Sequence, residues 1–128
     1  MDIYIAVDKR DKKKFITKAM EVKQELEKQN RDIKLVWNET DIKINKQSLC
    51  LVFTNSLEYI EEFKTNKKIE TICITNRLES QYILAVLKCV KDIYFLNMGL
   101  EEMVIRIQGF VNSYENRRKC YRGIINEI

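Results

Sequence analysis

The sequence predicts a three-layer α/β sandwich, in which a five-stranded parallel sheet of strand order 2-1-3-4-5 lies between two layers of helices. Residues 49–53 (LCLVF) form an uncharged apolar run that is too short for a helix and is typical of a central strand buried on both faces. Similar runs alternate along the chain with stretches of helical periodicity. Right-handed crossovers between parallel strands then favour this strand order.

The elements are expected in the order β-α-β-loop-β-α-β-α-β-α. The five strands are predicted at residues 3–7, 33–37, 49–53, 69–75 and 93–96. The segment 33–37 alternates and contains Lys34, which favours a place near the sheet edge. Helical spacing of apolar residues predicts helices at residues 11–30, 57–63, 78–89 and 100–128, the first of them capped by Asp11. Residues 38–47 show no helical period, so the helix between the second and third strands is short or missing.

Two strand-to-helix junctions repeat one pattern, TNSLE at residues 54–58 and TNRLE at residues 75–79. An Asn followed three residues later by a Glu resembles a capping box, so Asn55 and Asn76 are expected to cap helices. A binding role for the two Asn side chains is the alternative, because ligands of parallel sheets bind beyond the carboxyl ends of the strands.

The composition of the chain indicates a single folded domain and gives no sign of a nucleic-acid-binding or membrane protein. A chain of 128 residues with 45% hydrophobic residues can form one domain with a core. The net charge of +4 does not by itself indicate nucleic-acid binding, because the cations are interleaved with 19 acids and the run at residues 12–14 is typical of a solvated helix start. No apolar stretch is long enough to span a membrane and no signal-peptide pattern is present, so a cytoplasmic protein is expected.

The cysteines do not indicate a metal site. They lie too far apart for paired ligand motifs, and the chain contains no histidine. We expect the cysteines to be small buried hydrophobic side chains of a protein in a reducing compartment; they are Cys50, Cys73, Cys89 and Cys120. No cofactor is expected.

The last helix is longer than the sheet. At about 1.5 Å per residue its 29 residues span roughly 43 Å, so residues 1–114 are expected to form the domain and residues 115–128 a helical extension. Its apolar spacing predicts a seam for a protein partner or a homodimer, formed by Ile107, Phe110, Tyr114, Tyr121 and Ile124. Gly123 is expected to bend or break the helix. The chain is expected to be the front of a longer protein or one half of a dimer.

The basic residues of this extension have two interpretations. Cations near the carboxyl end of a helix are favoured by the helix dipole, which explains Arg117, Arg118, Lys119 and Arg122. A nucleic-acid patch that also uses Tyr114 and Tyr121 is the weaker alternative.

Residues 91–98 (KDIYFLNM), followed by LEEM at 100–103 and Arg106-Ile107, resemble the end of bacterial response-regulator receiver domains. In that family a strand with a Tyr leads to Lys-Pro and then to a helix that begins with an acidic pair and carries Arg-Ile. The resemblance covers about residues 1–114 and implies a flavodoxin-like, receiver-like fold.

The resemblance also implies a degenerate phosphorylation site. The family holds Mg²⁺ with two acids, accepts the phosphoryl group on an Asp, and adds a Ser or Thr and a Lys. These positions fall on Asp8, Lys9, Thr54 (or Asn55 if the register slips by one), Thr75 and Asn97, with Met98 where Pro is usual. One acid beside a lysine is a poor magnesium site, and a threonine lacks the nucleophilic carboxylate. Aspartyl phosphorylation and metal binding are therefore not expected.

The sequence thus favours a pseudo-receiver, a non-enzymatic regulatory domain that works by protein–protein interaction and not by phosphorylation. Proteins of this resemblance occur as amino-terminal modules of transcription factors, signalling enzymes and pilus-assembly localisation ATPases. The alternative is a flavodoxin-like binder of a flavin or nucleotide, or an enzyme on this fold. Such a site needs a phosphate-cradling loop after the first strand, whereas residues 8–12 (DKRDK) contain no glycine.

Overall fold

Five parallel strands form the middle layer of the molecule in the order β2-β1-β3-β4-β5, which confirms the predicted sheet. The computed structural model describes residues 1–29, 31–37, 47–63 and 68–127, with residues 36–37 and 117–127 as backbone only. The strands are β1 (Asp2–Val7), β2 (Ile33–Trp37), β3 (Ser48–Phe53), β4 (Ile69–Thr75) and β5 (Asp92–Phe95). The loop predicted at residues 38–47 lies almost wholly outside the described residues.

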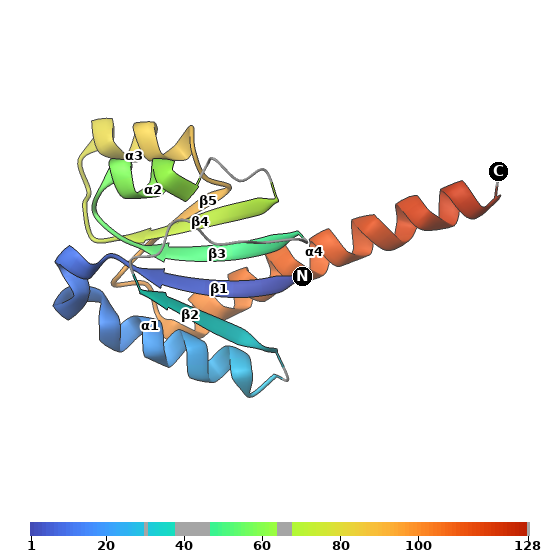
Figure 1. Ribbon diagram of the computed structural model, residues 1–128, viewed down its shortest axis with the longest axis horizontal. Helices are drawn as coiled ribbons and strands as arrows, with labels where there is room; N and C mark the ends of the chain where they lie inside the picture. Colours follow the sequence, from blue (N-terminus) through green and yellow to red (C-terminus); the bar gives the residue numbers. More distant parts are fainter. Residues whose placement is uncertain (30, 38–46, 64–67, 128) are drawn as a thin grey trace.

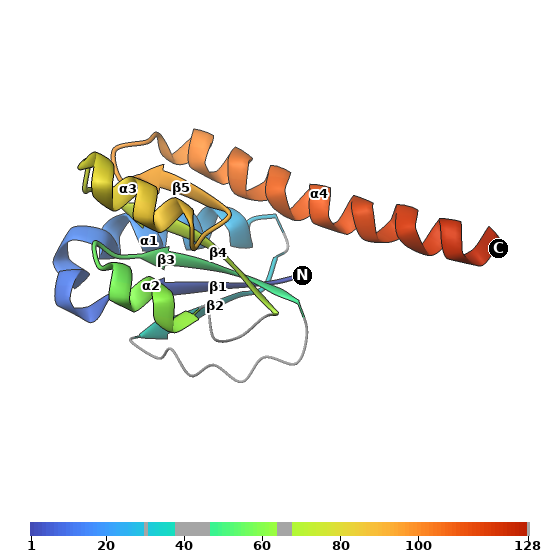
Figure 2. The ribbon, with the colours of Figure 1, turned by 90° about the horizontal axis from the view of Figure 1, so that it is seen from above.

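Two helices cover each face of the sheet (Figure 1, Figure 2). Helices α1 and α4 lie on one face, and α2 and α3 on the other. A short 3-10 turn, η1, connects β1 to α1. The helical segments are η1 (Lys9–Asp11), α1 (Lys12–Glu27), α2 (Leu57–Phe63), α3 (Ser80–Leu87) and α4 (Leu100–Glu127).

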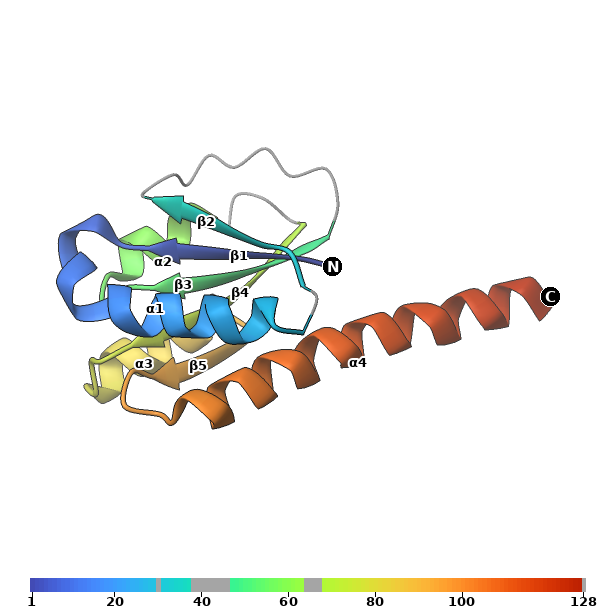
Figure 3. The ribbon, with the colours of Figure 1, turned by 90° about the horizontal axis from the view of Figure 1, so that it is seen from below.

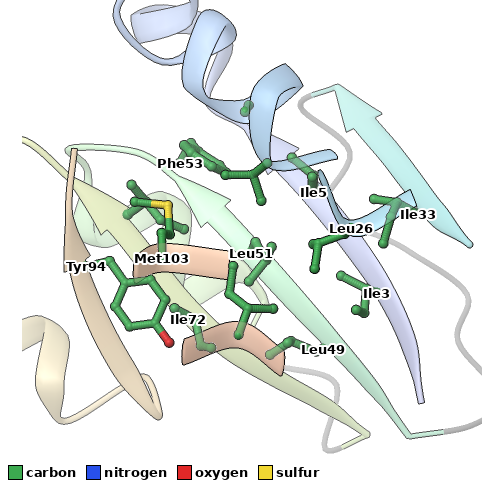
Figure 4. Close-up of a cluster of buried hydrophobic side chains, with 14 of the residues drawn as sticks. Ile3, Ile5, Leu26, Ile33, Leu49, Leu51, Phe53, Ile72, Tyr94 and Met103 are labelled. Carbon is green, nitrogen blue, oxygen red and sulfur yellow. The ribbon is translucent and has the colours of Figure 1, made fainter. Parts of the chain in front are cut away.

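Strand β3 is buried along its whole length, as predicted for the central strand. Because side chains alternate between the faces of a strand, Leu49, Leu51 and Phe53 pack with α1 and α4, whereas Cys50 and Val52 pack with α2 and α3. Figure 4 shows the first of these two cores. The strand thus joins both cores and holds their helices on one scaffold.

Two cysteines belong to the second core, as the sequence predicts. Burial raises the pKa of the Cys50 thiol well above its ordinary value and that of Cys73 to about 12. Both thiols are therefore neutral near pH 7, which does not suit a nucleophile.

Helix α4 runs from the sheet into solvent (Figure 3). Its first three turns are fixed to the sheet by Met103, Ile107 and Val111, which are fully buried. The helix then continues without a break through Gly123 to Glu127. Among the described residues, no helix is both long and apolar enough to cross a membrane.

The predicted seam along α4 is divided by this packing. Ile107 belongs to the core and cannot contact a partner in this fold, and Phe110 is partly buried against the same core. Tyr114 is half-buried near the end of the covered part. The side chains of Tyr121 and Ile124 lie outside the described part of the chain. Of the predicted seam residues, Tyr114 is thus the first that does not pack in the core cluster.

Candidate functional site

Asp8 is the buried centre of the site at the carboxyl ends of the strands. Its carboxylate directly follows β1 and is fully buried. Thr54 Oγ1 donates to Asp8 Oδ2 over 2.7 Å. Arg10 donates from its backbone N and from Nε to Oδ1, at 3.1 and 3.3 Å, and from Nη2 to Oδ2 at 3.2 Å. Both carboxylate oxygens are thus bonded within the chain.

These contacts keep Asp8 ionised. Burial by itself raises the pKa of this carboxyl, but the hydrogen bonds from Thr54 and Arg10 outweigh burial and leave the pKa below its ordinary value. The Asp8 carboxylate in turn raises the pKa of the Arg10 guanidinium. The predicted partner position, Lys9, lies exposed in η1.

Asp8 also corrects the predicted cap of the first helix. Its side chain caps η1 by accepting from the backbone N of Arg10. Asp11 occupies the N-cap position of α1 but makes no side-chain cap hydrogen bond. The extra turn moves the capping carboxylate three residues upstream, into the buried strand end.

The repeated TN pattern forms the same local structure at both junctions, and the threonine hydroxyls form its hydrogen bonds. Thr54 Oγ1 accepts from the backbone N of Ser56 at 3.0 Å, and Thr75 Oγ1 accepts from the backbone N of Arg77 at 3.1 Å. Each junction is therefore a turn closed by a threonine hydroxyl.

The capping role predicted for Asn55 and Asn76 is wrong. At α2 the Ser56 hydroxyl accepts from the backbone N of Tyr59 at 3.4 Å. Helix α3 begins only at Ser80, and its N-cap residue makes no side-chain cap bond. Where two strands end side by side, an Asn side chain can instead form hydrogen bonds with the residues that follow the neighbouring strand.

Asn55 makes such a bond. Its Oδ1 accepts from Thr75 Oγ1 at 2.7 Å and from the backbone N of Asn76 at 3.1 Å, and its Nδ2 donates to Asn76 Oδ1. The site therefore divides into a cluster around Asp8 and Thr54 and a second around Asn55 and Thr75.

Asn97 lies exposed after β5 and lines a cavity of about 280 Å³ with Asn76, Leu78, Phe95 and Leu96. A cation reaches this loop from α1, where Lys18 Nζ donates to the carbonyl of Met98 at 2.6 Å. Lys18 is not among the site residues that the sequence predicts. Its position three residues after the buried Phe15, on the flank of the buried helix face, is the signal that could have identified it.

The donor set at this edge does not fit Mg²⁺. A magnesium site needs exposed oxygen ligands that include one or two carboxylates. The carboxylate of Asp8 is buried and bonded to Arg10 and Thr54, and a lysine occupies the second acidic position. In the described part of the chain, no group of three His, Cys, Asp or Glu side chains could hold a metal ion.

Comparison with known proteins supports this architecture. No family model and no curated protein matches the sequence. Among solved structures, a CheY-like response regulator receiver domain protein from Methanospirillum hungatei JF-1 is similar over 91% of this chain and 98% of its own, with a TM-score of 0.66 and 13% identity. The chain has a receiver-like fold. A second solved structure, of a putative pilus assembly-related protein from Burkholderia pseudomallei K96243, is also similar. The similarity covers 84% of this chain and 87% of the Burkholderia chain, with a TM-score of 0.56 and 10% identity.

Proposed function

We propose that this receiver-like chain is a non-enzymatic regulatory domain of the cytoplasm, a pseudo-receiver that works by binding protein and not by phosphorylation. One observation carries the proposal. The residue at the expected acceptor position is Thr54, and its hydroxyl is buried and already donates to Asp8.

The chemistry of the neighbouring groups supports the same conclusion. Phosphoryl transfer needs an accessible nucleophile and a cation that stabilises the developing charge. Asp8 is the one carboxylate in the buried cluster, and Arg10 and Thr54 occupy its oxygens. Asn97 supplies no positive charge where the family places a lysine, and Lys18 is bonded to a backbone carbonyl. The site is therefore built to hold the strand ends together.

Reaction with acetyl phosphate and Mg²⁺ tests the proposal. We expect the intact mass of the protein to stay unchanged, because the carboxylate of Asp8 is buried and both of its oxygens are already bonded to Arg10 and Thr54. A receiver domain with the complete acidic site, treated in the same tube, is the control for the reagent. An adduct of one phosphoryl group on this chain, located to Asp8 or to a neighbouring residue, would contradict the proposal.

The projecting part of α4 is the surface that we propose for self-association. From their spacing in the sequence, we expect Tyr114, Tyr121 and Ile124 to share one side of a regular helix. Burying such residues between two helices stabilises association by about 1.5–3 kcal/mol per large side chain. This part of α4 extends past the sheet, so a second copy could reach it (Figure 3).

Light scattering on the full chain and on a chain cut after Asn116 tests this seam. The cut retains Val111, which is buried, and Glu115, which lies 3.6 Å from Arg31 and 3.7 Å from the amino terminus. We expect the full chain to be a dimer at micromolar concentration and the shortened chain to be a folded monomer. Equal masses for the two chains would refute the seam.

A further inference from the structure

Helices α1 and α4 lie side by side on one face of the sheet, and a groove of about 400 Å³ lies between them (Figure 1, Figure 3). One wall comes from the end of α1 and the residues just after it, and the other from the first turns of α4. The lining includes Glu25, Gln29, Glu101, Val104, Ile105 and Gln108. We call this set of residues the α1–α4 groove.

Two hydrogen bonds hold the walls of the α1–α4 groove together. Lys18 Nζ donates to the carbonyl of Met98 at 2.6 Å, and Arg31 Nη2 donates to Asn112 Oδ1 at 3.1 Å. All residues that line the groove lie between these two bonds in the sequence of their own wall. The groove is therefore a preformed feature of the fold, with the separation of its walls fixed at both ends.

The lining combines apolar side chains with neutral amides. Val104 is buried, whereas its neighbour Ile105 is 60% exposed. A single exposed isoleucine is ordinary on a protein surface, but here it lines a groove and offers an apolar contact to an incoming side chain. The amides of Gln29 and Gln108 can donate to and accept from a peptide backbone.

Both charged residues of the lining are acids. Within the described part of the chain, the side chain of Glu101 makes no ion pair or hydrogen bond, whereas Glu102 beside it pairs with Arg106 at 3.1 Å. Glu25 pairs at 2.9 Å with Lys28, whose side chain is 70% exposed, so this pair contributes little. The helix dipole favours acids in the first turn of α4, but it does not explain why the lining contains two carboxylates and no cation.

Charge complementarity indicates which partner this groove fits. Carboxylates attract Lys and Arg side chains, and Arg binds a carboxylate through two parallel hydrogen bonds. Nucleic acids and anionic lipid surfaces carry negative charge, so the acids of the groove repel them. A basic protein segment supplies the cations, the apolar side chain and the backbone amides together.

We infer that the α1–α4 groove binds a basic segment of a protein partner, with an apolar side chain against Ile105 and cationic side chains at Glu25 and Glu101. The inference rests on the proposed function, protein binding, and adds the place and the chemistry of the partner. The chain has a basic run of its own at residues 117–122 (RRKCYR), but this run belongs to the part of α4 for which self-association is proposed. We therefore assign the groove to a segment of a different protein.

The peptide N-acetyl-Arg-Leu-Arg-amide is the probe, and N-acetyl-Glu-Leu-Glu-amide is its charge-reversed control. In NMR titrations at low salt we expect the arginine peptide to bind at about millimolar concentration and to shift the signals of Ile105 and of the Gln29 and Gln108 side chains. The glutamate peptide should leave these signals unchanged. Added salt should weaken binding of the arginine peptide, because salt screens ion pairs at the surface.

Matched variants test the acids of the groove. Glu101→Gln removes the charge at nearly constant size and should weaken binding of the arginine peptide by about two- to fivefold. Glu102→Gln changes an acid outside the lining and should leave the affinity unchanged. Ile105→Ala should also weaken binding, without lowering the melting temperature, because Ile105 is exposed. Melting temperatures of all three variants confirm that each is folded.

Three results would overturn the inference. The first is an arginine peptide that leaves the groove signals unchanged or binds no better than the glutamate peptide. The second is equal affinity of the unaltered protein and a folded Glu101→Gln protein. The third is a shift of the same signals with protein concentration alone, which would assign the groove to a second copy. Each result is independent of the acetyl phosphate reaction, which tests the proposed function by itself.

Discussion

Replacing Asp8 by Ala is expected to lower the free energy of unfolding by about 2 kcal/mol. The change removes a charge-assisted hydrogen bond from Thr54, worth about 1.5–3 kcal/mol. It also removes the cap of η1, worth about 0.5–2 kcal/mol. Both contacts use the same carboxylate, so the two losses do not simply add. The loss stays below that of breaking a buried ion pair, because the freed Arg10 side chain is 65% exposed and can be hydrated. Urea denaturation of the two proteins at pH 7 measures the difference.

Asp8→Asn is the matched control for this change. An amide keeps one acceptor oxygen at the same place, so we expect about half of the loss seen with Ala. A loss equal to that of Ala would assign the stabilisation to the negative charge alone. No loss in either variant would contradict the account of Asp8 as the centre of the strand-end cluster.

The same contacts predict a pH dependence. The folded state lowers the pKa of Asp8, so its contribution to stability is fully present above the ordinary carboxyl pKa of about 4. It is lost as the pH falls through the lower pKa of the folded state. The stability difference between the unaltered protein and Asp8→Asn should therefore shrink below about pH 4. A difference that grew with acid would give the opposite sign and refute this assignment.

Replacing Phe53 by Ala is expected to have the largest effect of any single change described, a loss of about 3–5 kcal/mol. Phe53 ends the central strand, is fully buried, and meets the ring of Phe15 edge to face at a centroid distance of 6.2 Å. The cavity left by the ring would lie between β3 and α1, which cannot collapse without moving both. For a domain with a stability of about 5–15 kcal/mol, the loss leaves the fold marginal.

Phe95→Ala is the control for ring size. Phe95 ends β5 and is only partly buried, so its replacement should cost about 1–2 kcal/mol. Thermal unfolding followed by circular dichroism ranks the two variants. A smaller loss at Phe53 than at Phe95 would show that β3 is not the central strand of the core.

The fold could be predicted because few physical rules decide it. The side chains of an uncharged apolar strand such as residues 49–53 avoid water only if both faces of the strand are buried. A parallel sheet with short connections then allows few strand orders. The meeting of Asp8 and Thr54 follows from the same rules, since β1 and β3 are neighbours and Val7 pairs with Phe53. The residues that follow these two must then lie side by side.

The hydrogen bonds of the site could not be predicted in the same way. Asn55 can cap a helix or bond across a junction, and only the distance between the ends of β3 and β4 decides between these uses. Lys18 reaches Met98 from a residue 80 positions away, a contact with no counterpart in local spacing. The length of α4 follows from its apolar repeat. Which residues of that repeat are buried and which lie beyond the core depends on where the sheet ends.

A titration with Mg²⁺ and beryllofluoride, followed by the NMR signals of Asp8, Thr54 and Thr75, tests the central claim most directly. Beryllofluoride mimics a phosphoryl group only on an accessible carboxylate that a metal ion supports. We expect all three signals to stay unchanged at millimolar Mg²⁺ with and without beryllofluoride, because Asp8 is already bonded to Arg10 and Thr54. Saturable shifts of Asp8 and Thr54 that require both reagents would contradict it.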